Sequence, residues 1–236
     1  FADYPKFGFW TDYLYMGANG FGTSAYAGGI YAAFDRTTLF SGAALTSTNS
    51  SIAFTGDTDI FGMFPANMLA GDGTDSSKLP PSGTPEYFVA ESQTAYSFDV
   101  RKFQHGATAC GAGASLSSPV SVSQASYGYP AIPSGTSYTT DMVRQPGGGK
   151  PKLDSLGDEL MQRVVYRNIG GSESLWLSHT TCGSGADANG GCASSTTTTK
   201  PQWAQINVTG GTIATTPVQQ QIYAPATTLY RWTGSL

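Results

Sequence analysis

The chain has 236 residues, of which 12% are charged and 12% are aromatic, and its formal net charge is -4. The low charge excludes a coiled coil and a highly charged disordered chain, and the 12 Lys and Arg residues argue against a nucleic-acid-binding protein, which needs a basic stripe. No apolar run approaches the ~20 residues of a membrane span. The many aromatic residues and the Gly, Ser and Thr residues between them predict an all-β globular protein.

The first predicted unit covers residues 3–55 and begins with short, aromatic-rich strands. These strands are predicted at 6–10, 13–16 and 29–34. A Gly/Asn turn at 17–20 separates the second strand from the third. The segment 35–40 is predicted as an edge strand that ends at Ser41 and Gly42.

The second predicted unit covers residues 56–150. Its strands are predicted at 59–64, 87–90 and 96–103, and a turn-rich loop at 71–85 separates the first from the second. In the last strand Tyr96, Phe98 and Val100 alternate with polar residues, as in a strand with one buried face. Residues 105–151 are rich in Gly, Ala, Ser and Pro, and we predict a loop there.

The third predicted unit covers residues 153–225. Apolar residues at helical spacing predict a short helical turn at 154–159, and the β-branched residues that follow favour a strand at 160–168. A hairpin turn at 168–172 then leads into further strands. These are predicted at 173–179, 203–208 and 218–223, with the start of another at 228–236.

The chain therefore offers about three units of roughly four strands and the start of a fourth. Such repetition is typical of a β-propeller, and a β-sandwich is the alternative. A propeller blade takes about 40–50 residues and closure needs at least four blades, so 1–236 is interpreted as one incomplete propeller-like domain. We expect a further polypeptide, from the same precursor or a neighbouring chain, to lie against Phe1 and Leu236 and cover the unpaired edges.

Cys182 and Cys192 flank a short flexible loop, and a disulfide between them is the preferred interpretation. A zinc site would need a second pair of ligands, but His105 and His179 are isolated in the sequence. A disulfide implies an oxidising compartment, so we expect the protein outside the cell or at its surface. Cys110 is left over, as a free thiol or as a partner of something outside this chain.

Several blocks of the sequence resemble a family of large secreted bacterial proteins that is itself similar to the sialidase-like β-propellers. The blocks run in the family's order, at residues 3–8, 79–88, 152–161, 166–168, 223–225 and 230–235. The resemblance implies a propeller fold, but its motifs are structural and specify no chemistry. Members continue past the final Gly234-Ser235 with more blades. Members also often carry a cysteine just before the Gln145-Pro146 dipeptide, where this chain has Val143-Arg144, which leaves Cys110 without that partner.

A sialidase needs an arginine cluster for the substrate carboxylate and a Tyr/Glu nucleophile pair. Alternation would place Arg163 and Arg167 on one face of their strand, with Tyr166 and Glu173 as the nucleophile pair. The alternative is that these arginines are ordinary solvent-facing residues of a strand. The Asp-box turns of sialidases are absent from the sequence, which also lacks a nucleophile elbow, a phosphate loop and a Rossmann fingerprint.

Other polar motifs are weaker. Asp72 and Asp75 are the only calcium candidates, and their loop lacks the acidic density of a calcium site. Asn49 and Asn207 begin glycosylation acceptor sequences, which also arise by chance in a chain rich in Ser and Thr.

We therefore expect a non-catalytic extracellular β-propeller module with a structural, adhesive or surface-assembly role. A sialidase-like glycoside hydrolase or a glycan-binding lectin is the alternative, and a subunit of an extracellular filament coat is a third. A neighbouring protein chain and a glycan are the expected partners, whereas nucleic acid is not.

Overall fold

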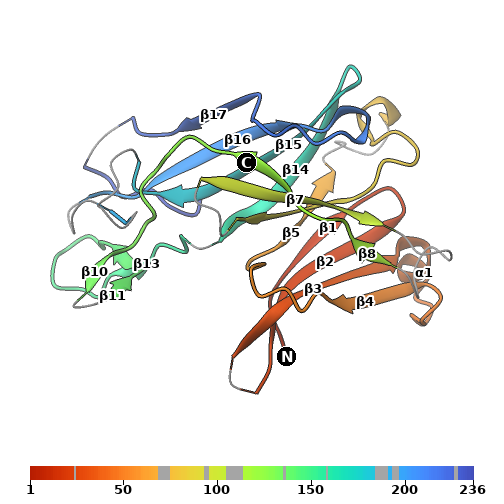
Figure 1. Cartoon of the computed structure of the whole chain (residues 1–236), viewed down its shortest axis with the longest axis horizontal. Helices are drawn as coiled ribbons and strands as arrows, with labels where there is room; N and C mark the ends of the chain where they lie inside the picture. The colour runs from red at the N-terminus through yellow and green to blue at the C-terminus, as the bar shows by residue number, and fades with distance from the viewer. Residues whose placement is uncertain are drawn as a thin grey trace.

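The computed structural model describes residues 1–23, 25–68, 75–92, 96–104, 114–134, 137–157, 159–183, 191–192, 197–225 and 228–236. Two β-sheets dominate this part of the chain, so the predicted all-β class is confirmed. The sheet formed by the N-terminal strands projects from the rest of the molecule, at the bottom and right of the view in Figure 1.

The first sheet is an antiparallel meander of four strands in chain order. They are β1 (Ala2–Phe9), β2 (Tyr13–Phe21), β3 (Tyr26–Asp35) and β4 (Ser50–Phe54). A short helix, α1 (Arg36–Ser41), follows β3 where the sequence predicted an edge strand, so that prediction was wrong. The helix forms because the Asp35 carboxylate accepts a hydrogen bond from Thr38 N at 2.6 Å and Gly42 ends the helix in the left-handed conformation.

The larger sheet has nine strands. Its order is β17 (Gln219–Ile222), β16 (Lys200–Asn207), β15 (Ser172–Thr181), β14 (Leu160–Ile169), β5 (Phe64–Met68), β6 (Tyr87–Glu91), β7 (Ser97–Gln104) and β8 (Ser115–Leu116), and β9 (Val120–Ser123) also pairs with β7. Two hairpins lie apart from it: β10 (Ile132–Ser134) with β11 (Ser137–Thr139), and β12 (Asp141–Val143) with β13 (Leu153–Asp154). Two 3-10 turns, η1 (Ser76–Lys78) and η2 (Thr209–Gly211), complete the described elements.

The arrangement of the sheets is compatible with the β-sandwich alternative and does not confirm a propeller. The first and third predicted units do contain four-stranded meanders, β1 to β4 and β14 to β17. However, β14 pairs in parallel with β5, which joins the second and third units into one sheet instead of two separate blades. Neither sheet closes on itself within the described residues.

Five further sequence predictions were wrong. The Gly/Asn turn expected at 17–20 does not form, because these residues continue β2 as far as Phe21 and pair with β3. The loop expected at 105–151 contains β8 to β12 within its described residues, since β8 and β9 pair with β7 and the others form short hairpins. The strand expected at 59–64 begins only at Phe64, because Gly62 adopts a left-handed backbone with φ of 59°. The helical turn expected at 154–159 is absent from its described residues, since β13 ends at Asp154 and Leu156 has a positive φ. The strand expected at 228–236 does not form. This segment lies over β15, where the Ser178 hydroxyl donates a hydrogen bond to Gly234 O at 2.7 Å.

The main core lies between the first sheet and the larger sheet and is rich in aromatic rings. The Trp10 ring lies 4.8 Å from that of Tyr166, and the Tyr15 ring lies 5.1 Å from that of Phe103. All four side chains are almost fully buried. Such T-shaped pairs add about 0.5–1.5 kcal/mol each beyond their burial, so they join the two sheets strongly.

Candidate functional site

The structure brings together two of the predicted catalytic residues, Tyr166 and Glu173. The Tyr166 hydroxyl donates a hydrogen bond to Glu173 Oε2 at 2.7 Å, and Gly210 N donates to Glu173 Oε1 at 3.0 Å. Tyr166 is 0% exposed and Glu173 is 3% exposed. Burial, and then the neighbouring Glu173, raise the pKa of Tyr166 above its ordinary value. These hydrogen bonds tie β14 to β15 and to η2. Because both side chains are buried, the pair offers no surface to a substrate.

The predicted arginine cluster does not form beside this pair. Arg163 and Arg167 are both exposed, and Arg167 lies on the opposite face of β14 from the buried Tyr166. The register of β14 with β15 is interrupted between Met161 and Val165, so the simple alternation that placed both arginines on one face does not hold there. The sialidase-like constellation is therefore split between the core and the surface.

A second buried polar cluster joins residues that are far apart in the sequence. His179 Nδ1 lies 2.8 Å from Glu91 Oε1, and the Tyr127 hydroxyl donates to Glu91 Oε2 at 3.1 Å. The Phe98 and Tyr127 rings pack edge-on against His179, which is 0% exposed. Burial and the nearby Glu91 raise the pKa of Tyr127. No local sequence pattern indicates this cluster, because its members come from β6, β15 and the chain after β9.

Glu86 is a fully buried carboxyl group, and burial, followed by the Asp12 charge, raises its pKa well above the ordinary value. Within the described part of the chain, only the Ala66 backbone acts on this carboxyl group as a hydrogen-bond donor, and its opposing effect on the pKa is smaller than that of burial. An acid whose pKa is higher in the folded than in the unfolded state stabilises the fold only while protonated. Its contribution is therefore present below the unfolded pKa and is lost as the pH rises towards the folded pKa.

We expect Glu86→Gln to raise the free energy of unfolding at pH 7 by about 1 kcal/mol or more. At this pH the carboxyl group is ionised in the unfolded chain, so folding must either protonate it or bury its charge, and both cost free energy. The amide of Gln is neutral and avoids this cost. At about pH 4 the wild-type group is protonated in both states, so the difference should largely disappear. Urea unfolding of both proteins at the two pH values measures this. A Gln variant that is less stable than wild type at pH 7 would contradict the burial of an uncompensated carboxyl group.

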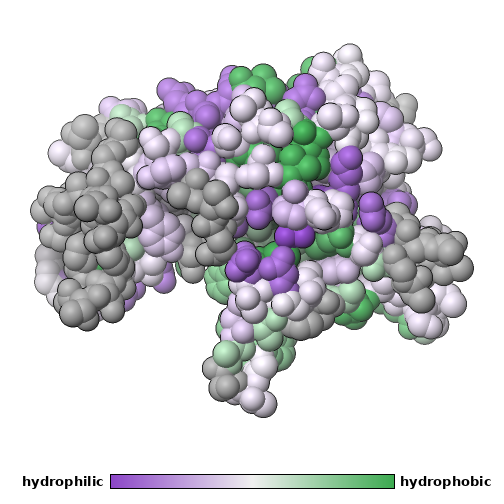
Figure 2. Space-filling model, in the orientation of Figure 1, coloured by the Kyte–Doolittle hydropathy of each residue, from purple (hydrophilic) through white to green (hydrophobic). Residues whose placement is uncertain are grey.

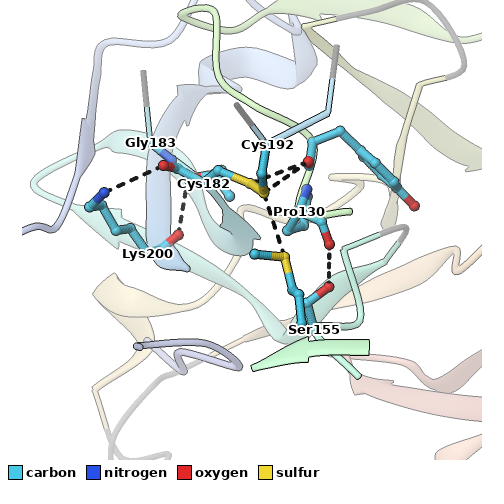
Figure 3. The surroundings of a disulfide bond; sticks show 9 residues. Pro130, Ser155, Cys182, Gly183, Cys192 and Lys200 are labelled. Atoms are coloured by element: carbon cyan, nitrogen blue, oxygen red, sulfur yellow. Dashed lines mark hydrogen bonds between the residues drawn. A yellow bond between two sulfur atoms is a disulfide. The ribbon is translucent and has the colours of Figure 1, made fainter. Parts of the chain in front are cut away.

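The predicted disulfide between Cys182 and Cys192 is present, with the two Cα atoms 5.7 Å apart. Figure 3 shows that it lies beside the turn containing Pro130 and close to Ser155 and Lys200. Cys182 N donates to Gly128 O at 2.9 Å, and Cys192 N donates to Ala131 O at 2.9 Å. The bond therefore fastens residues 128–131 to the end of β15. It also lies in a second, smaller core formed by Ile132, Met142, Val143 and the two cysteines.

The remaining predicted site residues that the structure describes show no binding geometry. The Asp75 carboxylate is engaged by Ser77 and Lys78, and the hydrogen bond from Ser77 lowers its pKa. Asp72 and Cys110, with His105, lie outside the described residues. Asn49 uses its amide within the α1–β4 loop, whereas Asn207 is exposed and accepts a hydrogen bond from Thr209 N.

Within the described residues, no group of three or more His, Cys, Asp or Glu side chains could hold a metal ion. None of the helices described is both long and apolar enough to cross a membrane.

The most unusual surface is the side of the first sheet that faces away from the larger sheet, which we term the outer face. The strand register places apolar side chains there in rows across the four strands. The rows contain Phe7, Met16, Ala32 and Ile52; Phe9, Leu14 and Phe34, with the polar Ser50 at the end of this row; and Ala18 and Ile30. Phe7 is 44% exposed, Phe9 45% and Ile52 68%. In the view of Figure 2, strongly purple atoms are few on the arm formed by the first sheet and gather where it joins the rest.

A sheet whose two faces are both apolar is typical of one that is covered on both sides. The inner face of the first sheet is covered, because Gly8 and Gly17 allow its backbone to lie directly against residues 63–66. No described segment of this chain covers the outer face as closely as residues 63–66 cover the inner face. Contiguous exposed apolar patches usually mark interaction sites.

The opposite side of the molecule presents a different surface, formed by β14 to β17. Trp176 and Trp203 stack there with ring centroids 5.8 Å apart and planes inclined by 19°. The register places Gln205, Gln219 and Gln221 on the same face, with Arg167 further along β14. A hollow of about 310 Å³ lies beside Trp176, lined also by Val165, Arg167, Ile169 and Leu236. This face combines aromatic rings with amide and guanidinium groups.

Comparison of the chain with protein-family models, with curated proteins and with solved structures finds no match.

Proposed function

We propose that the chain is a non-catalytic structural module of the extracellular space or cell surface, and that it works by packing the outer face of its first sheet against another protein. The observation that carries this proposal is the uncovered apolar face defined by Phe7, Phe9 and Ile52. Exposed side chains of this kind lose free energy on burial at about 25 cal/mol for each Å² removed from water. Burial of these side chains therefore favours association through this face.

The disulfide supports the proposed compartment. Bonds of this kind persist in oxidising surroundings and are rare in the reducing cytosol. The bond between Cys182 and Cys192 holds a small core together, which suits a module that must keep its shape outside the cell.

The buried polar groups support a structural role over a catalytic one. A nucleophile must reach its substrate, but the Tyr166–Glu173 pair is enclosed between the sheets. The exposed arginines lie on the surface, where they could not hold a substrate carboxylate next to that pair.

Glycan binding is the second candidate, and the stacked Trp176 and Trp203 favour it. Indole rings bury large apolar areas while keeping a polar N–H, and sugar rings pack well on such surfaces. The amides of Gln205, Gln219 and Gln221 would supply hydrogen bonds beside the rings.

A polar variant of the outer face tests the leading proposal. In the triple variant Phe7→Thr, Phe9→Thr, Ile52→Thr, β propensity is kept while the apolar surface is removed. We expect the wild type to bind an apolar fluorescent dye, and the triple variant to bind much less of the dye and to be more soluble. Ile169→Thr is the matched control, because Ile169 is 64% exposed but lies on the other side of the molecule. Equal behaviour of the wild type and the triple variant would contradict the proposal.

Glycan-array binding and turnover of fluorogenic glycosides separate the two candidates. The leading proposal predicts neither. Binding that is lost in Trp176→Ala and Trp203→Ala would establish the second candidate instead.

A further inference from the structure

The outer face of the first sheet carries enough detail to indicate its partner, and this step rests on the proposed function. Its rows contain no charged residue, although the chain has a formal net charge of -4. Two acidic copies repel one another over most of their surfaces. They can approach closely where the interface itself brings no charges together.

Polarity also argues against the other large face of the molecule as the occupant. Packing β14 to β17 onto this face would bury Arg167 and the glutamine amides against side chains that cannot accept or donate hydrogen bonds. Burying such groups without partners is costly. The side chains of a second copy's outer face are apolar apart from Ser50, whose hydroxyl already donates a hydrogen bond to Thr46 O, so this pairing carries no such cost.

The relief of the face is self-complementary. Phe7 and Phe9 protrude near the C-terminal end of β1, whereas a hollow of about 460 Å³ begins at the other end of that strand, around Phe1 and Ala2, and extends across the sheet to Ile52. This hollow is lined by Phe1, Ala2, Gly20, Phe21, Gly22, Ala27, Ile30, Ile52 and Ala53. Consider a twofold axis midway between two facing sheets, parallel to them and perpendicular to their strands. Its rotation reverses the direction of the strands in one copy relative to the other. It brings the phenylalanines of each copy to the hollow of the other.

The size of the face suits a dimer of moderate strength. Four strands about 4.8 Å apart, which average 8 residues at a rise of about 3.3 Å per residue, give the whole sheet a projected area of roughly 500 Å². Side-chain relief increases the accessible area, so two copies would bury roughly 1,000 Å² or more in total, which reaches the lower limit for a specific interface.

From these observations we propose that two copies of this chain pair face to face through the outer faces of their first sheets, related by a twofold axis. The interface is isologous and closed, so it yields dimers and not fibres. Sheets that pack in this way lie about 10 Å apart with their side chains interdigitated.

Sedimentation velocity over a range of concentrations tests the dimer with the whole chain. We expect the wild type to show a reversible monomer–dimer equilibrium. Ile52→Arg and Phe9→Arg should each weaken the dimer by roughly a hundredfold or more, because the twofold axis brings a charge from each copy into one apolar interface. Ile169→Arg, on the other side of the molecule, should leave the equilibrium unchanged. The side chains of Phe9, Ile52 and Ile169 are all exposed, so the substitutions should not disturb the core, and circular dichroism checks that the variants remain folded.

Three outcomes would overturn the dimer. They are a wild type that stays monomeric, a dimer that survives both arginine substitutions, and open-ended polymers, which indicate a head-to-tail interface. Binding of an apolar fluorescent dye then separates this failure from failure of the proposed function. A monomer that binds the dye, and loses it in Ile52→Arg, still has an uncovered interaction face with a different partner. A monomer that binds no dye contradicts both proposals.

Discussion

Replacing Gly8 with alanine should prevent the first sheet from packing on the larger sheet, and we expect a loss of about 3 kcal/mol or more in the free energy of unfolding. A Cβ atom at this position would lie far inside van der Waals distance of Ala66 O and 3.0 Å from the Ala66 carbonyl carbon. These are backbone atoms of β5, which cannot turn aside as a side chain can. The sheets would have to separate, and the aromatic core between them would loosen.

Urea unfolding with linear extrapolation measures this loss. Gly22→Ala is the matched control, because the nearest heavy atom to its added Cβ is Ala25 O at 3.7 Å and its φ is not in the left-handed region. Its stability should stay within about 0.5 kcal/mol of wild type. If Gly8→Ala is as stable as Gly22→Ala, β1 does not lie against β5 as described.

Removing the disulfide should have the second-largest effect. We expect the double variant Cys182→Ser, Cys192→Ser to lose about 2–3 kcal/mol, mainly because the unfolded chain regains the freedom of a loop of this length. Part of the loss should be local. Both sulfur atoms lie within 3.5 Å of Tyr129 O, and Cys192 Sγ also lies 3.5 Å from Met142 Sδ.

Thermal unfolding with and without a thiol reductant measures this contribution. The reductant should lower the midpoint of the wild type towards that of the double variant, and the midpoint of the double variant should not respond. For a chain of this length each 1 kcal/mol corresponds to about 2–4 °C. A wild type that is insensitive to complete reduction would contradict a stabilising role of the bond.

Local chemistry explains which elements could be predicted from the sequence. The meander of the third unit was predictable because aromatic and β-branched residues are separated by a Gly-rich turn at Ile169 to Ser172. In the first unit, β4 was not predicted, and β2 was predicted too short because its glycines were interpreted as a turn. Helix α1 was missed because Thr38, Leu39 and Phe40 favour strands by propensity, whereas a single Asp35 cap and Gly42 decide the outcome.

Long-range pairing could not be predicted. The parallel pairing of β14 with β5 joins residues about a hundred positions apart, and nothing in either strand specifies the other. It decides between separate blades and one wide sheet. The Glu91–His179 contact depends on the same long-range arrangement of strands. The Tyr166–Glu173 pair could be proposed from the sequence, because the two residues lie on neighbouring strands of the short β14–β15 hairpin.

The outer face of the first sheet was implicit in the sequence but needed the register to become visible. Phe7, Met16 and Ile52 are unremarkable as single apolar residues in a strand. Only the successive pairings of β1 with β2, β2 with β3 and β3 with β4 place them in one row on one side. The expectation of a further polypeptide against Phe1 and Leu236 remains a prediction.

Hydroxyl-radical footprinting read by mass spectrometry tests the central claim most directly. As the protein concentration rises through the association range, labelling of Phe7, Phe9 and Met16 should fall, while labelling of Trp176 and Trp203 on the opposite face should stay constant. Labelling of the three outer-face residues that does not change with concentration, or protection of the two tryptophans instead, would contradict an assembly built on the first sheet.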